Sequence, residues 1–67
     1  MTVPTSGAEL RRLRHLLALS QEDLASELGV TQAAVSQMES ECRPISRRTA
    51  LLLRRFLERR VTAATGP

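Results

Sequence analysis

The polar side chains that could do chemistry in this chain gather in one short segment, residues 31–37. Gln32, Ser36 and Gln37 offer amide and hydroxyl groups, which both donate and accept hydrogen bonds. At helical spacing they share an outer face with the small Ala33. An isolated polar face of this kind is usually just solvated, so the elements around it must decide whether it binds a partner.

Catalytic chemistry has little support in the sequence. The chain contains one histidine, His15, and one cysteine, Cys42, which give no metal-ligand cluster, no nucleophile–base pair and no internal disulfide. It also lacks a glycine-rich phosphate loop and a nucleophile elbow. We therefore predict that the chain is not an enzyme and that it uses no metal or cofactor.

The charge of the chain favours an anionic partner. Ten basic residues against seven acidic ones give a formal net charge of +3 and a sequence pI near 11.1. All of the cations are arginine, whose planar fork of donors suits phosphate and guanine edges, although GC-rich coding produces the same bias. Because the N-terminus lacks an apolar signal segment and no apolar run is long enough for a membrane span, we expect a cytoplasmic location.

Residues 1–67 are predicted to form a single domain without strands. The chain has one phenylalanine, no tyrosine or tryptophan, and no alternating β-branched pattern. We expect an all-α fold, a compact domain of four helices or of five. The ordered core should span about residues 6–61, and the small or turn-forming ends at 1–5 and 62–67 should be flexible.

Helix start signals define the first and last helices. Ser6 and Glu9 have the spacing of a capping box, and the helix that follows should end near Ala18. Its buried stripe consists of Leu10, Leu13 and Leu17. Ser46 is expected to cap the last helix, which should end at about Arg60.

The last helix carries more apolar residues than one stripe can bury. Some of them should therefore remain exposed on a lone monomer, and an exposed apolar patch usually marks a partner surface. We expect Leu52 and Phe56 to form a dimer interface.

Two short helices lie between these, joined by a tight turn. Ser20 and Asp23 mark the start of the second helix, and Gly29, which suits a left-handed turn, ends it. Thr31 should cap the third helix, with Val35 and Met38 pointing inward. Two short helices around a glycine-containing turn, with a polar outer face on the second, form the helix-turn-helix arrangement that presents a helix to DNA.

Three runs of residues make a resemblance specific. They are SQEDLA at 20–25, LGVTQ at 28–32 and VSQME at 35–39. Together they resemble the phage repressor and Cro type of helix-turn-helix domain, the XRE family, over roughly residues 8–57. The resemblance implies a lambda-repressor-like fold and a transcription regulator that binds double-stranded DNA.

The resemblance also implies which residues contact bases. Four positions match the family's base-reading face, namely Gln32, Ala33, Ser36 and Gln37. A glutamine can pair in bidentate fashion with N6 and N7 of adenine, and Ala33 can touch a thymine methyl group. Gln21 matches a glutamine that binds a phosphate and braces the first glutamine of the recognition helix, here Gln32.

Further phosphate contacts and one ion pair follow from the same resemblance. The expected phosphate contacts, besides Gln21, are Thr31, Arg43, Arg47 and Arg48. Glu39 matches an acid that pairs with an arginine of the first helix, here Arg14. Where many relatives have Asn-Gly after this glutamate, the present chain has Ser-Glu-Cys at 40–42, so no glycine is available for a left-handed residue.

We therefore expect a sequence-specific regulator, and favour a repressor that binds an inverted repeat as a homodimer. Two copies would place their recognition helices in successive major grooves, roughly 34 Å apart. One alternative is an antitoxin-type autoregulator with a toxin as its partner. Another is a protein-interaction module that has lost DNA binding, which the polar outer face of residues 31–37 disfavours.

Overall fold

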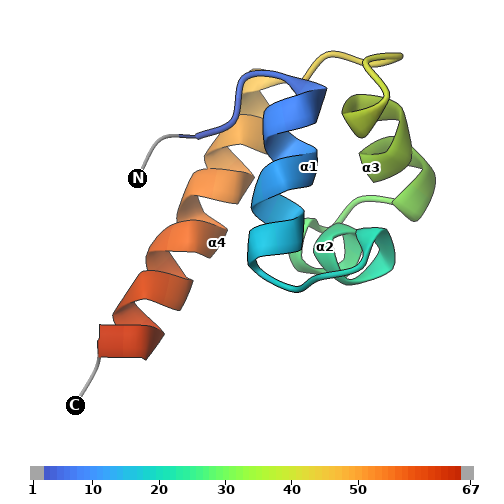
Figure 1. Cartoon of the computed structure of the whole chain (residues 1–67). Helices are drawn as coiled ribbons and strands as arrows, with labels where there is room; N and C mark the ends of the chain where they lie inside the picture. The colour runs from blue at the N-terminus through green and yellow to red at the C-terminus, as the bar shows by residue number, and fades with distance from the viewer. Residues whose placement is uncertain (1–2, 66–67) are drawn as a thin grey trace.

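Four helices and no strand make up residues 3–65, the part of the chain that the computed structural model describes; side chains are described for residues 3–60. They are α1 (Gly7–Leu16), α2 (Gln21–Leu28), α3 (Gln32–Glu39) and α4 (Arg47–Thr65) (Figure 1). The predicted all-α fold is confirmed.

Each helix begins at a hydroxyl side chain that the sequence predicted as its cap. The hydroxyl oxygen accepts a hydrogen bond from the backbone N–H three residues further on, over 3.0–3.2 Å. The caps are Ser6, Ser20, Thr31 and Ser46. At α2 the Asp23 carboxylate also accepts from the Ser20 N–H, which completes the predicted capping box.

The helix ends use three left-handed residues, of which only one is glycine. Gly29 ends α2 with φ 70°, as the sequence predicted. Ala18 (φ 56°) follows α1, and Glu41 (φ 67°) follows α3. At both of these ends the next residue donates its N–H to the carbonyl five positions back, from Leu19 to Arg14 and from Cys42 to Gln37, as in a Schellman motif. The missing glycine after α3 thus does not prevent a left-handed turn.

The left-handed conformation of Ala18 makes Ala18→Gly a stabilising change. A Cβ atom in this region costs on the order of 1–2 kcal/mol, and glycine's greater freedom in the unfolded chain offsets part of that gain. We expect the unfolding free energy to rise by about 0.5–1 kcal/mol, measured by urea denaturation.

Gly29→Ala provides the matched control for that prediction, because a Cβ at Gly29 meets no atom within 4 Å and adds only backbone strain. It should lower the unfolding free energy by about 1 kcal/mol. A loss of stability in Ala18→Gly would contradict the assignment of strain to this turn.

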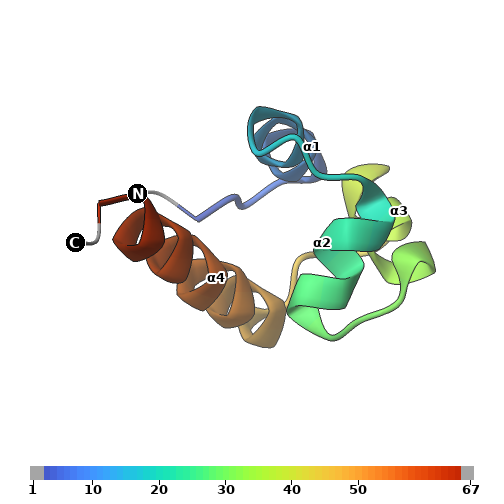
Figure 2. The ribbon, with the colours of Figure 1, turned by 90° about the horizontal axis from the view of Figure 1, so that it is seen from below.

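One hydrophobic core joins all four helices. Its least exposed side chains are Leu10, Leu24, Val35 and Leu53, one from each helix. Seen from below, α2 lies between α3 and α4, with α1 on the remaining side (Figure 2). The core therefore fixes α2 and α3 against each other and leaves the outer side of α3 in solvent.

The position of Phe56 corrects one expectation. Phe56 was expected to be exposed, but it is 3% exposed and belongs to the core. The guanidinium of Arg60 lies 5.5 Å from its ring centroid and covers it further. Leu52 is half-buried against the core, and among the α4 side chains up to residue 60 the exposed large apolar one is Leu51. Over the described side chains of α4, the apolar surface that solvent reaches therefore lies at Leu51 and Leu52 and not at Phe56.

Contacts and helical structure are also found outside the core limits expected from the sequence. Pro4 is buried and Val3 packs against the core, although both precede the expected start of the core at Ser6. The last helix continues past Arg60 to Thr65. Residues 1–2 and 66–67 lie outside the described part of the chain.

A close backbone contact joins the start of α1 to the end of α3. A Cβ atom at Gly7 would lie 2.2 Å from the carbonyl oxygen of Met38 and 2.7 Å from that of Glu39. The backbone N–H of Gly7 donates to the Glu41 carboxylate, at 2.5 Å. Glycine at position 7 and the acid at 41 together allow the start of α1 to contact the end of α3.

Candidate nucleic-acid interface

The outer side of α3 presents the predicted base-reading residues to solvent. The exposed positions are Gln32, Ala33, Ser36 and Gln37, whereas the opposite side of the helix, at Ala34, Val35 and Met38, is buried. Thr31, which caps the helix, is also exposed. The structure therefore gathers these side chains on one surface of a rigidly held two-turn helix.

A partly buried ion pair joins α1 to the end of α3. The Arg14 Nε donates to Glu39 Oε2 at 2.6 Å, and a terminal nitrogen of Arg14 donates to Oε1 at 3.0 Å. The two side chains are 12% and 4% exposed. Arg14 also donates to the backbone carbonyl of Leu19 at 2.9 Å, which fixes the loop before α2. This is the pair that the family resemblance implied.

Gln21 joins the same network from the start of α2. Its amide Nε2 donates to Glu39 Oε1 at 3.2 Å, so the acid holds α1, α2 and α3 together. The family resemblance implied that Gln21 braces Gln32. Among the described residues, the hydrogen-bond partner of the Gln21 side chain is Glu39 instead. Because the nitrogen is engaged, the amide oxygen of Gln21 is held in a defined direction.

The network also sets the protonation of Glu39. Burial alone would raise the pKa of this carboxyl, but the hydrogen bonds from Arg14 and Gln21 and the charges of Arg14 and Arg11 outweigh burial and lower it. The hydrogen bond to Glu39 raises the pKa of Arg14 in turn. Both side chains are thus charged at neutral pH.

We expect a pH dependence of stability that traces to Glu39. Since its pKa is lower in the folded than in the unfolded chain, its contribution is fully present above the unfolded value of about 4.3 and is lost as pH falls through the folded pKa. The difference in unfolding free energy between the wild type and Glu39→Gln should therefore shrink between pH 7 and pH 3. A difference that stays constant over this range would contradict the role given to the carboxylate.

Exposed arginines surround the start of α4. Arg43 lies in the turn after α3, and Arg47 and Arg48 form the first turn of α4. None of the three pairs with a carboxylate among the described residues. At Arg47 and Arg48 the positive end of the α4 dipole adds to the side-chain charges, so the start of this helix attracts anions.

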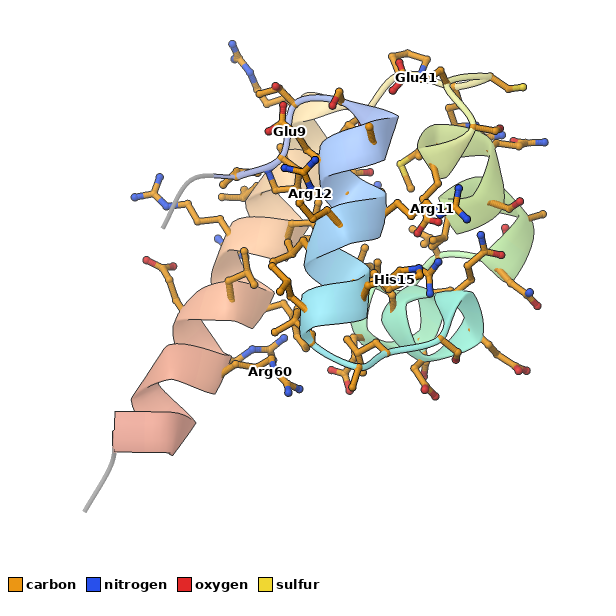
Figure 3. All side chains as sticks on the ribbon, viewed as in Figure 1. Glu9, Arg11, Arg12, His15, Glu41 and Arg60 are labelled. Carbon is orange, nitrogen blue, oxygen red and sulfur yellow. The ribbon has the colours of Figure 1, made fainter. Side chains whose placement is uncertain are left out.

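A groove between α1 and α3 was not anticipated from the sequence. Arg11, Arg12 and His15 line it from α1, together with Ala8, and Glu39 lines it from α3 (Figure 3). The α1 residues recur at helical spacing, which would have revealed a cationic stripe if the polar faces of this helix had been mapped as closely as those of α3.

Within the described residues no group of three or more His, Cys, Asp or Glu side chains could hold a metal ion. None of the described helices combines the length and apolar character that crossing a membrane requires. Cys42 is exposed and unpaired with any described cysteine.

Comparison with known protein families agrees with this geometry. A family model described as helix-turn-helix matches residues 10–62, which include α2, α3 and the turn between them. No match to a curated protein or to a solved structure was found. The matched segment covers most of the chain, and this protein therefore belongs to the helix-turn-helix family of Cro/repressor-like, XRE-type DNA-binding transcription regulators.

Proposed function

We propose that this chain is a sequence-specific repressor that binds an inverted-repeat operator as a homodimer, with α3 in the major groove. The observation that carries the proposal is the outer face of α3, where exposed donors and acceptors sit on a helix whose other side is locked into the core. A major groove admits one helix and displays a distinct hydrogen-bonding pattern for each base pair. Acting on DNA, the protein would work in the cytoplasm.

Base readout is assigned to four residues of α3. Gln32, at the first position of the helix, is the best placed for a bidentate pair with adenine N6 and N7. Ala33 beside it can pack against a thymine methyl group, and Ser36 and Gln37, one turn further on, can reach the next base pairs. Each good bidentate pair contributes about 1–3 kcal/mol of discrimination.

Phosphate contacts are assigned to residues on both sides of α3. Gln21 and Thr31 lie at the starts of α2 and α3, where free backbone N–H groups also face outward. The hydrogen bond to Glu39 directs the Gln21 amide and leaves its oxygen to brace Gln32 once DNA is bound. Arg43, Arg47 and Arg48 would hold phosphates on the opposite side, which adds affinity without reading sequence.

Dimerisation is proposed because a single α3 reads too few base pairs for an operator. Exposed Leu51 and half-buried Leu52 give α4 an apolar surface that a second copy could cover. Repression then requires only that the dimer occupies a promoter and excludes the transcription machinery.

Selection of bound sequences from random duplexes at about 150 mM salt tests this proposal. We expect an inverted repeat whose half-site centres are about 10–10.5 base pairs apart, and light scattering of the complex should give two protein chains per duplex. Selected sequences without a repeat, bound by one chain, would overturn the homodimer. No enrichment of any sequence would overturn specific recognition.

A further inference from the structure

The groove between α1 and α3 has walls of unequal charge. On the α1 side its lining residues are Ala8, Arg11, Arg12 and His15, which recur at i, i+3, i+4 and i+7 and so form one stripe of the helix. On the α3 side it is lined by Glu39. The groove is open to solvent and has a volume of about 400 Å³, far more than a single ion needs.

The acid in this groove is already neutralised. Both Glu39 oxygens accept hydrogen bonds from Arg14, and Oε1 also accepts one from Gln21. Arg11 is close enough to lower the Glu39 pKa, yet neither Arg11 nor Arg12 makes an ion pair or a hydrogen bond with a described residue. Their two charges therefore remain available in the groove.

His15 lines the groove beside Arg14. Its Nε2 lies 3.2 Å from a terminal nitrogen of Arg14, the residue that also holds the Leu19 carbonyl before α2. Figure 3 shows Arg11 and His15 both directed from α1 toward the side where α2 and α3 lie. The groove that the two arginines line thus shares Glu39 with Gln21, one of the proposed phosphate contacts.

We propose that this groove is a second DNA-backbone site, in which Arg11 and Arg12 bind phosphates just outside the base pairs that α3 reads. The inference rests on the proposed function. An open groove with arginines along one wall suits an extended chain of phosphates. Glu39 lines this groove and also binds Gln21, so one DNA strand can contact both Gln21 and the groove arginines. The contact adds affinity and salt dependence and carries no base specificity.

The slope of the logarithm of the DNA-binding constant against the logarithm of the salt concentration measures this contact. For the selected duplex, Arg11→Gln should reduce the magnitude of the slope by about 0.9, and the double change of Arg11 and Arg12 to glutamine by roughly 1.8. Each single change should weaken binding about tenfold at 150 mM salt. Arg59→Gln, which removes the same charge from the exposed far part of α4, should leave the slope nearly unchanged.

A neutral methylphosphonate placed at single positions flanking the operator locates the contact. One flanking substitution should weaken binding of the wild type and have little further effect on the Arg11→Gln variant, as expected of a coupled pair. Arg11→Lys, which keeps the charge, should retain most of the slope. The thermal midpoint of each variant, measured by circular dichroism, excludes unfolding as the cause of a loss.

An unchanged slope in Arg11→Gln, with specific binding of the wild type intact, would overturn the backbone site and leave the proposed function standing. An equal change in Arg59→Gln would also overturn it, because a general charge effect would then explain both. A wild type that binds no duplex specifically would overturn the proposed function itself, and this groove assignment with it.

Discussion

The Leu53→Ala variant is expected to lose about 2–5 kcal/mol of unfolding free energy. Leu53 is 0% exposed and packs in the core with Leu10, Leu24 and Phe56, so truncation leaves a cavity at the junction of the helices. A chain of 67 residues has on the order of 3–10 kcal/mol in total. The variant should therefore be close to unfolded at 37 °C, as urea denaturation followed by circular dichroism would show.

Leu16→Ala is the matched control, since Leu16 is 77% exposed and loses little contact on truncation. Its effect should stay within about 0.5 kcal/mol. Equal denaturation midpoints for Leu53→Ala and Leu16→Ala would show that the core described here is not the one that stabilises the domain.

Glu39→Ala is expected to cost about 1–3 kcal/mol, because it leaves the partly buried Arg14 without its counter-charge and hydrogen-bond acceptor. It also releases the Gln21 amide, so α1 and the start of α2 lose their common partner at the end of α3. The change in unfolding free energy at pH 7 measures the first effect. A loss of DNA affinity at a temperature where the variant is still folded would report the second.

Glu58→Ala is the control for this pair. The Arg54–Glu58 pair has atoms 3.9 Å apart and both side chains about two-thirds exposed, at 66% and 65%, so its loss should cost no more than about 0.5 kcal/mol. If Glu39→Ala were as mild as Glu58→Ala, the ion pair would not be what joins α1 to α3.

Local signals explain why so much of the fold could be predicted from the sequence. A hydroxyl cap such as Ser20 and a left-handed glycine such as Gly29 act within a few residues of themselves, and both lie where they were expected. The outer face of α3 could be predicted equally well, because the burial of Val35 and Met38 on one side of the helix leaves Gln32 and Gln37 exposed on the other.

The features that escaped prediction depend on how whole helices pack. The apolar residues of α4 cover more than one stripe, and only the rotation of α4 against the core decides that Phe56 is buried and Leu51 exposed. The left-handed Glu41 is favoured by its contact with Gly7, which lies far away in the sequence. The groove at Arg11 likewise exists only because α1 and α3 lie next to each other.

The affinity of the selected duplex and of a scrambled duplex for the wild type and for Gln32→Ala tests the central claim most directly. The account predicts a preference of at least ~10³-fold for the selected duplex in the wild type. It also predicts a loss of about 1–3 kcal/mol in Gln32→Ala, with relaxed choice at one base pair. Ser26→Ala, at an exposed position near the end of α2, should bind like the wild type. Equal binding of both duplexes, or no effect of Gln32→Ala, would contradict the account.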